Sequence, residues 1–381
     1  MNPKSLNSKT FYPQLILDAL KHVRYPGTGI DIVSSDMVDD DIRIDGNKIS
    51  FSLVLDKPND PFAKSLVKAA EQAILTYAGA DAEIKGNITV RFRNEIPKTP
   101  EKALPQVKNI IAVFSGKGGV GKSTVSSNLA VALAHEGYKV GLLDADIFGP
   151  SIPKMFGLEE ARPVLEPVDG RDLIRPEEKY GVKMLSIGFF VDPDNAVLWR
   201  GGMASNALKQ LITDAYWGEL DYFIIDLPPG TSDIHLTMVQ TLAITGAIVV
   251  TTPQEVALAD ARKGISMFTG EKVNVPILGL VENMAWFTPA ELPNNKYYLF
   301  GKEGGKKLAQ DLHIPLLGQI PIVQSIREGG DSGTPVACNP DSITGLAFLD
   351  LARNVVEQVK IRNATLPETQ KVEISAKNNR K

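Results

Sequence analysis

Two lysines and four glycines between positions 116 and 123 carry the clearest chemical signal in the chain. The segment reads Gly-Lys-Gly-Gly-Val-Gly-Lys-Ser and fits the Walker A pattern G-x-x-x-x-G-K-[ST]. It follows an apolar run, residues 110–115, and precedes a helix-prone stretch. A helix N-terminus offers unpaired N–H groups and the positive end of a dipole to phosphate oxygens. The sequence therefore predicts a site for the phosphates of a nucleotide.

The residues of this loop have expected roles in binding ATP and Mg²⁺. The glycines allow a tight turn that aims backbone N–H groups at the phosphates. Lys122 is expected to reach the β- and γ-phosphates, and the Ser123 hydroxyl is expected to ligate Mg²⁺. The predicted nucleotide-binding loop comprises Gly116, Lys117, Gly118, Gly119, Val120, Gly121, Lys122, Ser123 and Thr124.

The second lysine inside the loop, Lys117, is not needed by an ordinary Walker A motif. We expect its side chain to leave the loop away from the loop's own phosphates and to reach the triphosphate of a second protomer. A cation supplied in trans is worth roughly 10³–10⁵ in rate. The sequence thus predicts slow hydrolysis in a monomer and a homodimer that forms with ATP. The alternative is a solvated lysine without a catalytic role.

Three aspartates at the carboxyl ends of predicted strands complete the expected site. Asp144 ends one apolar run, Asp146 lies two residues later, and Asp226 ends another run. Ligands of open α/β sheets bind at this edge. We expect Asp226 to be the Walker B carboxylate that holds Mg²⁺ through water, Asp144 to point toward the outer shell of the metal, and Asp146 to position the attacking water. The N–H of Gly230 is expected to meet the γ-phosphate. An isolated aspartate would more simply be a helix cap or a solvated charge.

The elements that must position these residues alternate between strand and helix from residue 109 onward. This alternation predicts a doubly wound, mostly parallel α/β sheet in a P-loop NTPase domain over residues 108–360. A helix over residues 348–356 spaces its apolar residues as a stripe that should dock on this domain. The expected strands are apolar almost throughout, as in sheets covered on both faces, and span residues 110–115, 140–144, 183–187, 222–226, 247–251, 277–282 and 316–320.

A small α+β domain is predicted in front of the NTPase domain, over residues 1–93. Residues 94–107 hold three prolines among charges, which is typical of a linker. Residues 361–381 are polar and are expected to form a disordered tail. The small domain should contain helices over residues 11–23 and 60–78 and strands over residues 30–33, 48–55 and 88–92.

Composition narrows the possible functions. The chain has 381 residues, 43% of them hydrophobic, which is enough for a core in each of two domains. A formal net charge of −4 argues against broad electrostatic binding to nucleic acid. The one cysteine, Cys338, excludes an internal disulfide framework. Since there is no apolar run of 18 residues and no signal-peptide core, we expect a soluble cytoplasmic protein without a membrane partner.

The loop at 116–123 resembles the deviant Walker A motif of the MinD-like superfamily. Four further segments are similar to its Mrp/ApbC branch, the iron–sulfur cluster carrier ATPases, and the N-terminal domain resembles the small assembly-type domain fused in front of bacterial members. The segments are Trp199-Arg200-Gly201, Trp217 to Tyr222, Asp226 to Asp233, and Thr252 to Leu258.

This resemblance implies an ATP-dependent homodimer that holds a cluster between its protomers and passes it to apo iron–sulfur proteins. It also implies that Asn283 contacts the adenine. Lys117, Asp146 and Asp226 would then take the roles described above.

The sequence departs from this family where the cluster should bind. Carriers of the family typically follow the Glu-Asn-Met segment with a Cys-x-x-Cys pair, whereas here Met284 is followed by Ala-Trp-Phe-Thr-Pro. Four thiolates are the usual requirement for such a cluster, and a dimer of this chain offers only its two copies of Cys338. Ligands could come from Cys338, from other donors such as Glu291, or from a partner. Cys338 could equally be a small buried apolar residue.

Three functions therefore remain open at the level of sequence. The first is the cluster carrier, and the second is an ATP-driven dimer switch that binds partners but no cluster. The third is a MinD/ParA-type positioning ATPase on a membrane or on DNA. MinD-like membrane binding needs a C-terminal amphipathic helix with basic flanks, which residues 348–356 and the mildly basic tail match poorly. ATP hydrolysis is common to all three.

Overall fold

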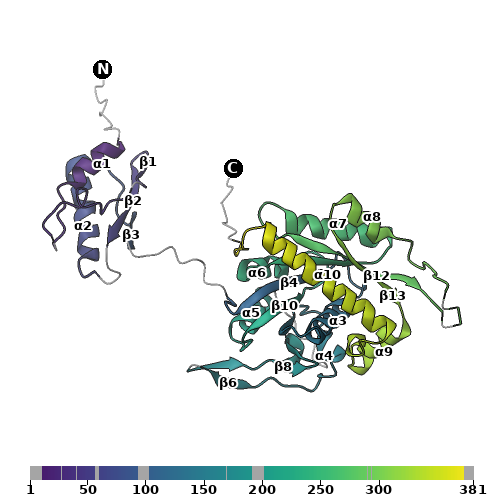
Figure 1. The fold of residues 1–381 in the computed structure, drawn as a ribbon. Helices are drawn as coiled ribbons and strands as arrows, with labels where there is room; N and C mark the ends of the chain where they lie inside the picture. The colour runs from purple at the N-terminus through teal and green to yellow at the C-terminus, as the bar shows by residue number, and fades with distance from the viewer. Residues whose placement is uncertain are drawn as a thin grey trace. The chain divides into compact units, whose positions relative to one another are not determined.

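In the computed structural model, the described part of the chain comprises residues 11–26, 28–39, 41–55, 60–92, 103–168, 170–190, 201–289, 291–292 and 294–372. Residues 94–102 of the linker expected over residues 94–107, the segment Trp199-Arg200 and residues 373–381 lie outside it. The end of that expected linker is part of the second unit, since β4 begins at Val107. The chain divides into two compact units, residues 1–99 and 100–381 (Figure 1).

The first unit is a small α+β fold with its own core. Strands β1 (Arg43–Asp45), β2 (Lys48–Leu55) and β3 (Ile88–Phe92) form a sheet in the order β1-β2-β3, in which β2 and β3 run parallel. Helix α1 (Pro13–Leu20) and helix α2 (Ala63–Ala73), which continues as a π-helical turn η1 (Ile74–Ala78), supply the rest of the core.

The strand predicted over residues 30–33 is wrong. The chain turns there, and only a single bridge joins Arg24 to Asp31. The Asp31 carboxylate accepts hydrogen bonds from the backbone N–H groups of Val33 and Ser34, at 3.1 and 2.8 Å. Such an Asx turn satisfies backbone donors locally and prevents the extended conformation that the apolar alternation suggested.

The second unit contains the predicted doubly wound sheet, so the expected fold class is confirmed. The order of its eight strands is β13-β12-β11-β4-β10-β5-β9-β8, and every neighbouring pair is parallel except β8 with β9. A separate hairpin joins β6 (Leu165–Val168) and β7 (Arg171–Ile174). The sheet strands are β4 (Val107–Phe114), β5 (Val140–Asp144), β8 (Glu177–Lys179), β9 (Val182–Ser186), β10 (Leu220–Asp226), β11 (Gly246–Thr251), β12 (Ile277–Phe287) and β13 (Leu316–Ile322).

Helices cover both faces of this sheet (Figure 1). The connection from β4 to β5 and the connections from β9 onward run in opposite directions along the sheet. Their helices therefore lie on opposite faces, and the topological switch point is at the carboxyl end of β4. The helices are α3 (Lys122–His135), α4 (Ile152–Met155), α5 (Gly201–Thr213), α6 (Asp233–Thr241), α7 (Glu255–Thr269), α8 (Gly304–Asp311), α9 (Gln324–Ser332) and α10 (Ile343–Thr365), with short 3₁₀ turns η2 (Ile187–Phe189) and η3 (Val336–Cys338).

The predicted docking of the last helix is confirmed. Helix α10 packs against α3 and β13, and its apolar stripe, which includes Phe348, Leu351 and Val355, is buried. None of the helices in the described ranges has the length and apolar character needed to cross a lipid bilayer.

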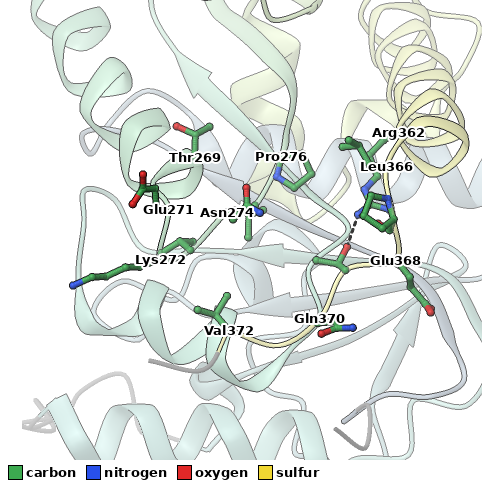
Figure 2. A pocket seen from close by; sticks show the side chains of 14 residues that line it. Thr269, Glu271, Lys272, Asn274, Pro276, Arg362, Leu366, Glu368, Gln370 and Val372 are labelled. Atoms are coloured by element: carbon green, nitrogen blue, oxygen red, sulfur yellow. Dashed lines mark hydrogen bonds between the residues drawn. The ribbon is translucent and has the colours of Figure 1, made fainter. Parts of the chain in front are cut away.

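The chain beyond residue 360 is more ordered than its polar composition predicted. Helix α10 continues to Thr365, and the segment 366–372 lies against the rest of the second unit. The Arg362 guanidinium donates to the carbonyl of Pro367 at 2.8 Å, and the Val372 N–H donates to the carbonyl of Val239 at 3.0 Å. A cavity of about 750 Å³ lies between this segment and the loop before β12 (Figure 2). Contacts with residues distant in sequence thus outweigh composition, and the expectation of disorder from residue 361 is wrong as far as residue 372.

Candidate nucleotide site

The loop between β4 and α3 has the backbone geometry that its glycines allow. Gly119 and Gly121 have φ angles of +80° and +82°, in the left-handed region that favours glycine. Gly116 leaves no room for a side chain, because a Cβ there would overlap the backbone of α7 at Asp260. The loop is therefore a tight turn held against α7, and it leads directly into the N-terminus of α3.

The three side chains predicted to hold phosphate and Mg²⁺ meet at the end of β10. The Lys122 ammonium donates to Asp226 Oδ2 at 2.8 Å, and the Ser123 hydroxyl donates to the same oxygen at 2.6 Å. Asp226 is fully buried, and Lys122 is only 6% exposed. A buried carboxylate at this position requires such partners, since burial without them is costly. Lys122 and Ser123 of the predicted Walker A motif thus both bind the carboxylate of Asp226, the predicted Walker B residue.

Ser126 also belongs to this cluster, although the sequence interpretation missed it. Its hydroxyl donates to the other carboxylate oxygen, Asp226 Oδ1, at 2.6 Å. The spacing carried a signal, because a residue three positions after Ser123 lies on the same face of a helix. Ser126 therefore fixes the orientation of the carboxylate that is predicted to face the metal.

The Asp144 carboxylate accepts three hydrogen bonds that hold the loop after β5. Its Oδ1 accepts a hydrogen bond from the N–H of Asp146 at 3.1 Å, and its Oδ2 accepts from the N–H of Ile152 at 3.2 Å and from the Ser186 hydroxyl at 3.0 Å. Burial, followed by the charge of Asp226 on the neighbouring strand, raises the pKa of Asp144 to about 7. These contacts give Asp144 a structural role in the β5–α4 loop, and its place in the outer shell of Mg²⁺ stays a prediction.

Asp146 lies on the open side of the cluster. Its carboxylate is 3.9 Å from the Lys122 ammonium, and 14% of its side chain is exposed. Burial raises the pKa of this carboxyl, while the Lys122 charge lowers it. Asp146 is therefore close to the predicted phosphate position and reachable by water, as its proposed role requires.

Asn283 and Gly230 make bonds within the chain that differ from their predicted contacts with nucleotide. The Asn283 amide donates to the carbonyl of Val120 in the loop at 2.8 Å. The Gly230 N–H donates to the carbonyl of Ser115 at 2.9 Å. Both groups therefore touch the segment around the phosphate loop, and each would have to exchange this bond for one to the nucleotide.

Lys117 is partly exposed on the loop. Across the described ranges of the chain, its ammonium makes no hydrogen bond or ion pair, so it is free to reach a second protomer.

Comparison with known protein families identifies the family of the chain. Residues 106–356, more than half of the chain, match the family described as NUBPL iron-transfer P-loop NTPase. The chain belongs to this family. Residues 13–85 also match a second family, described as iron–sulfur cluster assembly protein, so both parts of the resemblance noted from the sequence are confirmed.

Several relatives of the chain are named iron–sulfur cluster carrier protein. The one from Synechocystis is 42% identical over 353 residues, which cover 91% of this chain and 97% of the relative. The one from Escherichia coli K12 is 50% identical over 262 residues, which cover 68% of this chain and 69% of the relative. Among solved structures, the nucleotide-binding protein from Archaeoglobus fulgidus in complex with ADP is 39% identical, with a TM-score of 0.54, and the match covers 63% of this chain and 92% of that one.

The family's expected cluster site is not built from thiolates in this NTPase. After Met284, strand β12 continues through Trp286 to Phe287, and Thr288 and Pro289 follow. Within the described residues, no three His, Cys, Asp or Glu side chains gather closely enough to hold a metal ion. Glu291, the other donor considered from the sequence, is exposed on the loop beyond β12.

Cys338 is partly buried against the core of the second unit. It ends the turn η3, whose Ala337 N–H donates to the side chain of Asn128 at 3.0 Å, so the turn packs beside the middle of α3 rather than beside the phosphate loop. Burial raises the pKa of the Cys338 thiol, which disfavours the thiolate that binds metal. This position does not support Cys338 as a ligand of an iron–sulfur cluster. It is the position expected of a half-buried residue that only packs against its neighbours.

Proposed function

We propose that this chain binds and hydrolyses ATP as a homodimer and acts in the cytoplasm as an iron–sulfur cluster carrier that serves apoproteins. The observation that carries the proposal is the set of hydrogen bonds that joins Lys122 and Ser123 to Asp226 at the phosphate loop. The chain that holds this arrangement belongs to an iron-transfer NTPase family. Relatives at 42–50% identity are named iron–sulfur cluster carriers, which supports an iron–sulfur cluster as the cargo.

The ATPase step follows from the positions of the chain's own side chains. Lys122 would hold the β- and γ-phosphates, and the N-terminal N–H groups of α3 would bind phosphate oxygens. Asp146 would orient the attacking water, while Asp144 holds the loop that carries Asp146. Lys117 of a second protomer would reach the γ-phosphate, which makes hydrolysis depend on dimerisation.

The oxygen donors at the site fit Mg²⁺. The Ser123 hydroxyl and the Asp226 carboxylate lie 2.6 Å apart, and a hydroxyl with a carboxylate is the donor set expected beside nucleotide phosphates. When bound there, Mg²⁺ would neutralise charge on the phosphates. Ser123 would ligate the ion directly, and Asp226 would do so through water.

A second candidate function is an ATP-driven dimer switch that binds partners without a cluster. The specific observation that favours it is the single cysteine, which is half-buried, has a raised pKa and lies beside the middle of α3. In this case the chain would keep the ATPase and lack the cargo site.

The experiment that separates the two functions measures iron and acid-labile sulfide per dimer after anaerobic reconstitution, together with ADP release. Wild type and Cys338→Ala are compared side by side. Stoichiometric cluster in wild type that is lost in the variant would support carriage through Cys338, and cluster retained in both would place its ligands elsewhere. ADP release without cluster in either protein would leave the switch, and no ADP release in either would contradict both functions.

A further inference from the structure

Glu282 is a fully buried carboxylate that ties three elements together. Its Oε2 accepts hydrogen bonds from the N–H groups of Gly305 and Lys306 at the start of α8, the second at 3.3 Å. Its Oε1 accepts from the Gln319 side chain on β13 at 2.7 Å. A buried charge is stabilised when hydrogen bonds and a helix N-terminus compensate its loss of hydration. Glu282 thus joins β12, β13 and α8 at one point.

These bonds lie where a long loop leaves the sheet and returns to it. We call this loop the arm (residues 288–303, described except at positions 290 and 293) and the place where its two ends meet the root. The arm leaves β12 after Phe287 and returns to α8 at Gly304 (Figure 1). Its first part is held by reciprocal backbone hydrogen bonds of 2.8 Å between Phe287 and Tyr297. The Lys296 ammonium lies 3.8 Å from the centre of the Trp286 ring. Beyond the root, Leu292, Tyr297 and Leu299 are exposed.

Two glycines make the root tight. A Cβ at Gly305 would lie 2.8 Å from Glu282 Oε2, and a Cβ at Gly304 would overlap the carbonyl oxygen of Pro253 in the segment after β11. Side chains at these positions would push α8 away from the sheet. The Gly-Gly pair after Glu303 therefore allows the carboxylate of Glu282 to reach the backbone of the returning arm.

The next residue of β12 contacts the nucleotide site. Neighbouring residues of a strand face opposite sides of the sheet, so Glu282 faces α8 while Asn283 faces the phosphate loop. The Asn283 amide donates to the Val120 carbonyl and lies where a Cβ of Gly121 would be. Directly after it, Met284 has a φ of +55°, and the pairing of β12 with β13 shifts register between Asn283 and Phe287. A single peptide bond therefore joins the anchor of the arm to a contact of the phosphate loop.

We propose that Glu282 is a positioning residue that couples nucleotide binding to the position of the arm. The proposal rests on the nucleotide site described above and on Asn283 as the adenine contact. An Asn amide can pair with the N6 and N7 groups of adenine but not equally with guanine. When adenine replaces the Val120 carbonyl as the partner of Asn283, the end of β12 must adjust. Because Glu282 holds β12 to the start of α8, the root of the arm moves with it.

Two readouts test this coupling. The first is the preference for ATP over GTP in equilibrium binding, which depends on how firmly Asn283 is held. The second is the change in Trp286 emission on addition of Mg-ATP, measured as the difference between the chain and its Trp286→Phe variant. Trp286 is well placed as a reporter, because it lies three residues after Asn283 and beneath the Lys296 ammonium.

Glu282→Gln keeps the shape of the side chain and removes its charge. We expect the ATP-over-GTP preference to fall about fivefold to tenfold, in line with the loss of charge from buried hydrogen bonds, and the Trp286 response to fall by at least half. The double variant Glu282→Gln with Gln319→Glu returns a carboxylate to the pair, so a charge-assisted hydrogen bond again joins the two side chains, and it should restore both readouts. Glu303→Gln is the matched control, because it alters an exposed carboxylate beside the same helix start and should change neither readout.

The outcomes separate this proposal from the proposed function. If the wild-type chain binds no nucleotide, the proposed function itself fails. If it binds ATP and Trp286 emission does not respond, the coupling is refuted even though the nucleotide site stands, and this result does not depend on the folding of any variant. A folded Glu282→Gln protein with unchanged selectivity and a full Trp286 response would also overturn the role of Glu282.

Discussion

The ammonium of Lys122 and the carboxylate of Asp226 form a buried ion pair 2.8 Å long at the floor of the phosphate loop. The two residues lie 104 positions apart and come from the start of α3 and the end of β10. Their partners Ser123 and Ser126 use both oxygens of the same carboxylate. The site is therefore a preorganised polar cluster, and each member should matter for stability as well as for hydrolysis.

Removing only one charge of this pair should destabilise the fold strongly. Lys122→Met leaves Asp226 buried without its cation, and we expect a loss of about 3–5 kcal/mol in the free energy of unfolding. Lys122→Met combined with Asp226→Leu removes both charges, and we expect a far smaller loss in the free energy of unfolding. Urea unfolding followed by circular dichroism measures both variants. Equal losses in the single and double variants would show that the pair does not determine local stability.

Ser126 should contribute to hydrolysis through Asp226. In Ser126→Ala, Asp226 loses a hydrogen bond to a charged group, which is worth about 1.5–3 kcal/mol, and kcat should fall about tenfold while ATP still binds. Ser127→Ala is a matched control on the same helix, because Ser127 is also buried but its hydroxyl contacts the sulfur of Met155 at 3.4 Å. The comparison requires kcat and KM for both variants. A similar fall in kcat for Ser127→Ala would indicate a general effect on α3 instead.

His235 should make stability depend on pH. Burial lowers the pKa of this imidazole to about 4, while its Nδ1 accepts a hydrogen bond from the N–H of Ser232 at 3.1 Å in the capping box of α6. Because the unfolded chain binds the proton more readily, the contribution of His235 is complete above about pH 6.5 and is lost as pH falls toward 4. The shift from 6.5 to about 4 corresponds to about 3 kcal/mol at most.

The variant His235→Gln tests this pH dependence. Glutamine can keep the reciprocal bond of the capping box and does not titrate. We expect its free energy of unfolding to change less than that of wild type between pH 7 and about 4.5. Unfolding curves for the two proteins at several pH values give the comparison. If the free energy of unfolding changes with pH in the same way in both proteins, His235 is not a source of the acid sensitivity.

The sequence predicted those parts of the site that lie inside short motifs or at strand ends. The Walker A spacing located Lys122 and Ser123, and the apolar run before Asp226 placed that carboxylate at the right edge of the sheet. Local chemistry and topology suffice there, since parallel strands bring their carboxyl ends together. The same reasoning placed Asp146 at this edge of the sheet, where its carboxylate lies 3.9 Å from the Lys122 ammonium.

The sequence could not predict features whose partners are distant along the chain. Ser126 and Glu282 look like an ordinary helix serine and a strand glutamate until Asp226 and Gly305 are brought beside them. Arg362 and Val372 belong to a polar stretch that long-range contacts keep in place. The missed turn at Asp31 had a different cause, because a side chain competed with the extended backbone.

The trans role of Lys117 can be tested by mixing two inactive variants. Lys117→Ala should bind ATP and lose dimer-linked hydrolysis, and Asp146→Ala should hold an ATP-bound dimer without turnover. If Lys117 acts across the interface, a mixed dimer has one site with both defects and one intact site, formed by Asp146 of one protomer and Lys117 of the other. Random mixing should then restore up to about a quarter of wild-type turnover, because about half of the dimers are mixed and each has one intact site.

The mixing result also distinguishes the alternatives. If Lys117 acted within its own protomer, each site of a mixed dimer would lack one group, and the mixture would stay as inactive as the separate variants. Unchanged turnover in Lys117→Ala alone would assign this lysine to the solvated surface, and normal turnover in Asp146→Ala would remove that carboxylate from the mechanism. Restored activity requires a site built from both protomers, because only such a site can combine the intact Asp146 of one variant with the intact Lys117 of the other.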